Sequence, residues 1–234
     1  KDIWYKNIFL SSNGVLANSS RIEKLLQSGL TNLNISINSL QKTTYEKIHW
    51  KNDLNIVLKN IENLIKLKSK YSFELTLKFV INKYNESEIV SFKKKFWWIK
   101  EIDNIKFWYI DNQAGFSDIT YWIPSDNIIK KYWDKQRKYS VPCKYLFNDI
   151  FVTYDWYLWW CCTDIWGYLS TFDLTQGSLE DARKNSYLIR LRYKHIINNL
   201  SNTLCNYCIN DIKNVKPLVP QFINFKHQYE NSCS

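Results

Sequence analysis

The chain has 234 residues, 45% hydrophobic and 23% charged, with a formal net charge of +10. This composition is ordinary for a folded protein and excludes an intrinsically disordered chain. No apolar run approaches the roughly 20 residues of a membrane span, and no signal peptide opens the sequence, so we expect a cytoplasmic protein without a membrane partner. Lysine and arginine are spread along the chain, which disfavours a nucleic-acid groove.

The first half of the chain, to about residue 110, alternates short apolar runs with longer amphipathic stretches. This alternation is typical of β-strands joined by helices over a parallel sheet. We expect strands at residues 8–10, 33–37, 73–81 and 105–110. We expect helices at residues 19–27, along one long stretch between 40 and 67, and at 89–96. Four strands with three crossovers cannot close a barrel, so the sheet is expected to be open or truncated.

The helix limits follow from capping residues and apolar spacing. Ser19 or Ser20 is the expected N-cap of the first helix, and Gly29 is the expected left-handed residue after its end. Along the long second stretch, Ile56, Ile61 and neighbouring leucines are expected to form the buried face.

Small polar clusters end three of the predicted strands. They are residues 11–14 (Ser-Ser-Asn-Gly), 36–38 (Ser-Ile-Asn) and 82–86 (Asn-Lys-Tyr-Asn-Glu). The carboxyl ends of parallel strands carry ligand groups in open α/β sheets and in barrels, so the clusters could line one pocket. Taken singly, each also has the composition of an ordinary turn.

From about Pro124 the pattern changes, and cysteines appear for the first time at Cys143. Residues 148–160 are typical of a hairpin around a turn at 154–156. Residues 178–192 are typical of a helix capped by Ser178, with Leu179 among its apolar residues. We therefore place a domain boundary between residues 112 and 142.

All six cysteines follow residue 142: Cys143, Cys161, Cys162, Cys205, Cys208 and Cys233. Without a secretion signal, a CxxC pair plus two distant cysteines predicts a four-thiolate metal site rather than disulfides. The candidate ligands are Cys143, Cys161, Cys205 and Cys208. A structural zinc and an iron–sulfur cluster both fit four thiolates. Cys162 is expected to be a small buried residue, and Cys233 receives no role.

The spacing of these cysteines resembles the twitch or SPASM domain of radical SAM enzymes. In that signature a glycine precedes the second cysteine by five positions. Here twelve residues follow Cys143, Trp156 stands at the glycine position, and four further residues precede Cys161. The Cys205–Cys208 pair matches the continuation of the domain. The two further cysteines of the full SPASM signature are absent. The resemblance therefore implies the shorter twitch form, with one auxiliary [4Fe-4S] cluster held by the four candidate cysteines.

The first half resembles the later part of the radical SAM barrel. Residues 11–14, 35–39 and 80–86 are similar to the ends of its third, fourth and fifth strands. In the family these strand ends face S-adenosylmethionine, which implies contacts from Asn13, Ser36, Asn38 and Asn82. The CxxxCxxC motif of the family and its Gly-Gly-Glu are absent, which we interpret as N-terminal truncation.

The resemblance implies an α/β fold: a partial (β/α)6, TIM-like radical SAM barrel at residues 1–120, a linker at 121–142, and a small α+β twitch/SPASM domain at 143–234. It implies an enzyme that generates a 5′-deoxyadenosyl radical from S-adenosylmethionine to modify a peptide or carbohydrate. A catalytic [4Fe-4S] cluster is expected in the missing part, and a flavodoxin or ferredoxin is the expected electron donor. Catalytic residues are not identified, and this chain alone is expected to be inactive.

Two alternatives remain open from the residues. A zinc-stabilised domain with four cysteine ligands and a basic, aromatic nucleic-acid surface would account for the cysteines and the charge. The 11 tryptophans against 5 glycines also allow two interpretations: an aromatic binding platform, or UGA codons that the organism reads as glycine. Trp50, Trp98 and Trp156 stand where relatives commonly carry glycine.

Overall fold

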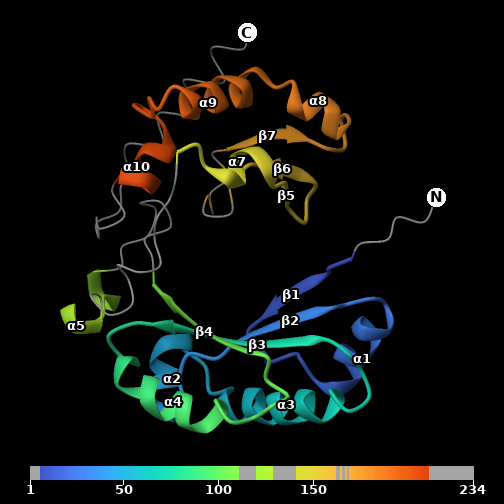
Figure 1. Cartoon of the computed structure of the whole chain (residues 1–234), viewed down its shortest axis with the longest axis vertical. Coiled ribbons are helices and arrows are strands. Elements are labelled where there is room, and N and C mark those ends of the chain that lie inside the picture. Colours follow the sequence, from blue (N-terminus) through green and yellow to red (C-terminus); the bar gives the residue numbers. More distant parts are fainter. Residues whose placement is uncertain are drawn as a thin grey trace. The chain divides into compact units, whose positions relative to one another are not determined.

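The computed structural model describes residues 6–110, 120–128, 141–161, 164, 167 and 169–210 (Figure 1). The chain divides into two compact units. The first holds the described residues 6–110 and 122–128; the second holds 120–121 and those from 141 onward. No helix in the described part is long and apolar enough to cross a membrane.

The first unit is built on a parallel sheet of four strands in the order β1-β2-β3-β4. Its strands are β1 (Phe9–Ser12), β2 (Asn32–Ser36), β3 (Glu74–Ile81) and β4 (Asn104–Tyr109). Each neighbouring pair is parallel. The predicted α/β class and the four parallel strands are therefore confirmed.

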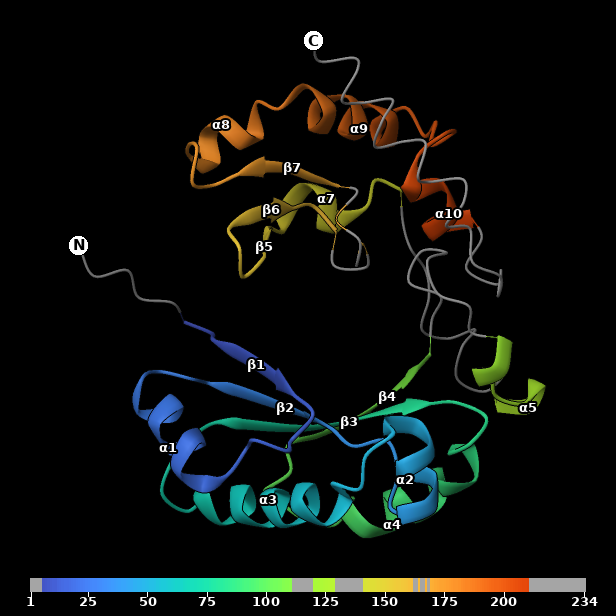
Figure 2. The ribbon, with the colours of Figure 1, turned by 180° about the vertical axis from the view of Figure 1, so that it is seen from behind.

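The helices of this unit lie on one face of the sheet (Figures 1 and 2). They are α1 (Ser19–Gln27), α2 (Lys42–His49), α3 (Leu54–Leu67) and α4 (Ile89–Phe96), with the short turn η1 (Glu86–Glu88) before α4. Alternate strand residues pack against them and are fully buried, among them Leu33, Ile35, Leu75, Leu77, Phe79 and Ile81. Period-two alternation sends these apolar side chains to the helix-covered face.

Three helix predictions need correction. The long stretch between residues 40 and 67 is two helices, because Trp50 adopts a left-handed conformation with φ of 53° and ends α2. Ile56, expected in the core, is 48% exposed because the break sets the apolar face of α3 over Leu54 and Val57 instead. The N-cap of α1 is Asn18, whose side chain accepts a hydrogen bond from the Arg21 N–H at 3.0 Å.

Part of the expected linker packs on the first unit. The Lys83 N–H donates to the carbonyl of Trp122, in the turn η2 (Thr120–Trp122), at 3.0 Å. The Trp122 ring meets the Tyr84 ring edge-on at 5.4 Å. The Ser125 N–H, just before the short α5 (Asp126–Ile128), donates to Glu86 at 2.7 Å. These contacts anchor residues 122–125 beside the end of β3.

In its described residues, the second unit joins a small antiparallel sheet to four helices. Its elements are α7 (Lys144–Asn148), β5 (Phe151–Val152), β6 (Tyr157–Trp159), β7 (Ser170–Asp173), α8 (Leu179–Arg183), α9 (Ser186–Ile196) and α10 (Leu204–Asn210). The strand order is β5-β6-β7. The core consists of Leu146, Leu158, Trp160, Leu169, Ala182, Leu188, Leu191 and Leu204.

The predicted hairpin and the Ser178 cap are confirmed. The helix expected at residues 178–192 is interrupted, because the Asn185 side chain accepts hydrogen bonds from two following N–H groups and starts a new helix, α9. Leu179, one of the apolar residues of the expected helix, is 43% exposed at the first position of α8.

Candidate functional site

The sheet face opposite helices α1 to α4 carries polar side chains. By strand alternation from the buried residues, this face includes Ser11, Asn32, Asn34, Ser36, Glu74, Thr76, Lys78, Asn104 and Lys106. A parallel sheet is ordinarily apolar on both faces, since both are usually covered. Polar residues here therefore indicate a face that meets water or a ligand.

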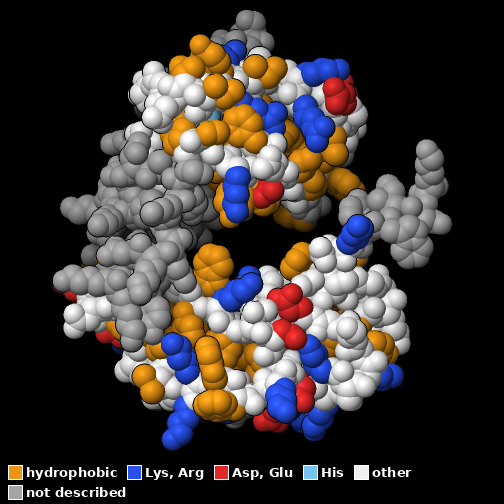
Figure 3. Space-filling view, in the orientation of Figure 1, with side chains coloured by type: hydrophobic (Ala, Val, Ile, Leu, Met, Phe, Trp, Pro, Cys, Tyr) orange, Lys and Arg blue, Asp and Glu red, His pale blue; other side chains and the backbone are white. Residues whose placement is uncertain are grey.

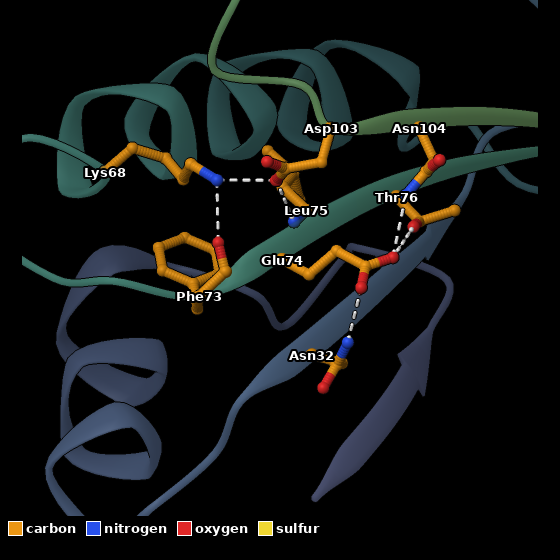
Figure 4. Close-up of polar contacts among 8 residues, drawn as sticks. All are labelled: Asn32, Lys68, Phe73, Glu74, Leu75, Thr76, Asp103 and Asn104. Carbon is orange, nitrogen blue, oxygen red and sulfur yellow. Dashed lines mark hydrogen bonds and ion pairs between the residues drawn. The ribbon is translucent and has the colours of Figure 1, made fainter. Parts of the chain in front are cut away.

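At the end of this face where β2, β3 and β4 begin, polar contacts centre on Glu74 (Figure 4). Its carboxylate accepts from Asn32 Nδ2 at 2.7 Å, from Asn104 Nδ2 at 2.7 Å and from the Thr76 hydroxyl at 3.2 Å. These bonds join β2, β3 and β4 and occupy the carboxylate. We assign the cluster a structural role.

Further along the same face, two lysines lie side by side. Lys78 of β3 and Lys106 of β4 are register partners, and Ser36 of β2 is the partner of Lys78 on the other side. Lys78 Nζ donates to the Ser11 hydroxyl at 3.4 Å. Burial lowers the pKa of Lys78, and the positive charge of Lys106 lowers it further. We call Ser36, Lys78 and Lys106 the lysine row. Its positive charges and hydroxyl group are suited to binding an anion.

The predicted strand-end residues adopt different roles. The Asn38 side-chain oxygen accepts from the Val80 N–H at 2.8 Å, and that of the buried Asn82 accepts from the Tyr84 N–H at 2.9 Å. Asn85 links them, because its Nδ2 donates to the Asn38 carbonyl and its Oδ1 accepts from the Asn82 N–H, both at 2.8 Å. The structure thus brings Asn38 and Asn82 into one network at the ends of β2 and β3.

Asn13 and Ser36 lie outside that network. The Asn13 side chain accepts from the Val15 N–H at 3.2 Å, within the turn after β1. Ser36 is half-buried at the end of β2, in the lysine row. Whether any of these predicted residues contacts S-adenosylmethionine stays a prediction.

The four candidate cysteines all pack against the core of the second unit. Cys143 is the N-cap of α7 and Cys161 follows β6. Cys205 and Cys208 both lie on α10, where their i, i+3 spacing sets the two side chains on one helix face. Each is a thiol in this structure, with no disulfide joining them.

The surroundings of Cys205 include the other three candidate cysteines. Burial raises the pKa of the Cys205 thiol well above its ordinary value. Negative charge on Cys161, Cys208 and Cys143, and then on Asp164, raises it further.

The four cysteine side chains are suitable donors for a thiolate-bound metal group. Four sulfur ligands suit zinc or an iron–sulfur cluster. The side chains are not drawn together at ligand distances: among the described residues, no group of three or more His, Cys, Asp or Glu could hold a metal ion as placed. Cys162 and Cys233 lie outside the described residues.

His195 is a buried polar residue at this site that the sequence analysis missed. It lies on α9 and is fully buried. Its Nδ1 accepts a hydrogen bond from the Cys143 backbone N–H at 3.3 Å, while its Nε2 has no hydrogen-bond partner. A single histidine after the basic residues Arg190, Arg192 and Lys194 gave no signal in the sequence.

Comparison with known proteins links the chain to one enzyme. No family model matches. The chain is 28% identical over 140 residues to the GTP 3',8-cyclase of Synechocystis sp.. The matched segment covers 58% of this chain and 39% of that protein. It is 34% identical over 89 residues to a probable GTP 3',8-cyclase of Sulfurisphaera tokodaii, covering 38% and 27%.

GTP 3',8-cyclase is a radical SAM enzyme, so these partial similarities support a relationship of the chain to that family. The matched segments span well under half the length of either relative. Iron–sulfur clusters and S-adenosylmethionine are the cofactors that this relationship implies.

Proposed function

We propose that this chain is part of a radical SAM enzyme that carries an auxiliary [4Fe-4S] cluster in its second unit and modifies a peptide or carbohydrate. The similarity to the two GTP 3',8-cyclases is the observation that carries the enzyme class. When bound, S-adenosylmethionine and a catalytic [4Fe-4S] cluster supply a 5′-deoxyadenosyl radical that abstracts a substrate hydrogen. The CxxxCxxC motif for that cluster is absent from residues 1–234, so we propose that this chain alone does not cleave S-adenosylmethionine.

In this proposal the first unit binds and orients S-adenosylmethionine. Asn38 and Asn82 use their side chains to brace the ends of β2 and β3, which holds that edge of the sheet rigid. Ser36 and Asn13 offer polar atoms beside this edge for the ribose or the carboxylate. A rigid edge places a bound ligand without further loss of conformational entropy.

The second unit holds the auxiliary cluster through Cys143, Cys161, Cys205 and Cys208. The packing of all four cysteines against one hydrophobic core supports a shared metal group. The hydrophobic core behind them keeps water from the sulfur side of the site. The auxiliary cluster would accept an electron from the substrate or limit the access of the substrate to the active site. A flavodoxin or ferredoxin would serve as the electron donor of the enzyme.

A second substrate class is supported by a separate observation: a substrate with a phosphate or carboxylate group. The observation that favours it is the pair Lys78 and Lys106 on the polar sheet face. A nucleotide, as in the names of the two relatives, belongs to this class.

The nucleic-acid alternative receives less support. On the molecular face drawn in Figure 3, Lys and Arg side chains lie scattered among neutral and acidic ones rather than in one stripe. A nucleic-acid groove ordinarily needs a continuous basic surface.

Anaerobic reconstitution of the chain with iron and sulfide tests the proposal. We expect a brown protein with about four irons and four sulfides per chain. Serine substitution at each of the four ligand cysteines should reduce the iron content, whereas Cys162→Ser and Cys233→Ser serve as matched controls that retain it. A colourless protein with one tightly bound zinc would overturn the cluster and favour the zinc domain with four cysteine ligands.

A further inference from the structure

The protonation of the His195 ring is fixed by its contact with Cys143. Nδ1 accepts the Cys143 backbone N–H at 3.3 Å, so this nitrogen carries no proton in that bond. In the neutral ring the proton then resides on Nε2. His195 therefore presents a buried Nε2–H donor.

This donor is left without an acceptor. Nε2 has no hydrogen-bond partner, and the residue is fully buried. Leaving a buried N–H without an acceptor is energetically unfavourable. Native proteins rarely keep such a group unless a ligand or a redox centre completes it.

The surroundings of His195 restrict what that acceptor can be. On α9, His195 shares the buried face with Leu188 and Leu191, which belong to the core of the second unit. The other side chains of this core are hydrocarbon, apart from the Trp160 and Tyr187 polar groups and the four cysteine sulfurs. The buried carboxylate of Asp164 accepts the Leu169 N–H at 2.5 Å. Among the described side chains of this core, sulfur is thus the most numerous acceptor atom.

We propose that the His195 Nε2–H donates a hydrogen bond to a sulfur atom of the metal group held by the four cysteines, either a ligating thiolate or a cluster sulfide. The inference rests on the proposed auxiliary cluster. His195 acts here as a positioning residue: Nδ1 holds the backbone of Cys143, and Nε2 holds the sulfur charge. Hydrogen bonds to sulfur stabilise the more negative, reduced cluster and raise its reduction potential.

The test uses the reconstituted chain and two spectroscopic readouts. In the reduced wild-type cluster, electron–nuclear double resonance should detect an exchangeable proton that disappears in D₂O, with a coupling that ¹⁵N-histidine labelling assigns to the ring. His195→Phe should lose this signal and shift the midpoint potential to a more negative value. His195→Gln, whose side-chain amide also donates, should restore part of the shift.

His49 provides a matched control, because its Nε2 is also buried and without a partner but lies in the first unit. His49→Phe should leave the cluster potential unchanged. A fully loaded cluster without the exchangeable signal, an unchanged potential in His195→Phe, or direct iron–nitrogen ligation would overturn the inference alone. A wild-type chain that assembles no cluster would overturn the proposed function and the inference with it.

Discussion

Lys68, at the end of α3, pairs with Asp103, just before β4: Nζ lies 2.5 Å from Oδ2 (Figure 4). Lys68 Nζ also donates to the Phe73 carbonyl at 2.6 Å, and Asp103 accepts the Leu75 N–H at 2.7 Å. Burial favours a higher pKa for Asp103, but the bonds from Lys68 and Leu75 outweigh it and lower the pKa. The pair thus fastens the helix layer to the edge of the sheet.

Removing the cation should destabilise the first unit. We expect Lys68→Met to lower the free energy of unfolding by about 1 kcal/mol, a value reduced because the Asp103 side chain is partly exposed. Urea unfolding followed by circular dichroism measures it. Lys42→Met is the matched control, since Lys42 and Glu46 form an exposed pair at 3.8 Å. Equal losses in both variants would contradict the anchoring role.

The same pair predicts a pH dependence. Because the pKa of Asp103 is lower in the folded chain, its stabilisation is present above the ordinary value of 3.8 and is lost as pH falls through the lowered value. The stability difference between wild type and Asp103→Asn should therefore be largest near neutral pH and shrink in acid. Unfolding curves at a series of pH values check this. A difference that grows on acidification would refute the assignment.

The lysine row on the polar sheet face makes a prediction about ligands. The double variant Lys78→Gln with Lys106→Gln should bind pyrophosphate about fivefold more weakly, since two charges near the anion are removed. Isothermal titration calorimetry at low and high salt measures the loss. Lys59→Gln, a change on α3 in the helix layer, is the control. Equal affinity in both variants would remove the lysine row as an anion site.

The sequence predicted the first unit well where the pattern was local. Alternating apolar residues located all four strands, and α4 begins at Ile89 and ends at Phe96 as expected. The break between α2 and α3 was missed because it depends on Trp50, a residue that ordinarily avoids the left-handed conformation. No propensity scale places a helix end there.

The candidate site was also predictable only in part, because some of its features depend on local patterns and others on tertiary packing. The number and spacing of the cysteines single out four candidate ligands, and the structure packs all four against one hydrophobic core. That they bind a metal stays a prediction. The lysine row depends on the register between β3 and β4, and the role of His195 depends on how α9 packs on α7. Both are tertiary relationships, so neither could be derived from local patterns.

Two tryptophans occupy backbone positions suited to glycine. In the described part of the chain, the non-glycine residues with positive φ are Trp50 at 53°, Trp156 at 66°, and two asparagines. Both tryptophans are exposed, at 85% and 62%, so burial does not offset the strain. Both are positions where the sequence suggested a glycine decoded as tryptophan, and the backbone agrees with that hypothesis.

Trp50→Gly and Trp156→Gly should therefore each raise the free energy of unfolding. A left-handed non-glycine residue costs about 1–2 kcal/mol, and glycine loses about 0.5–1 kcal/mol in entropy, so we expect a gain of about 0.5–1 kcal/mol. Trp98, 81% exposed and without positive φ, is the control: Trp98→Gly should bring no gain. Losses in all three variants would show that no strain resides at these positions. The gene gives an independent check, since UGG codons at Trp50 and Trp156 would exclude recoding and leave strained tryptophans.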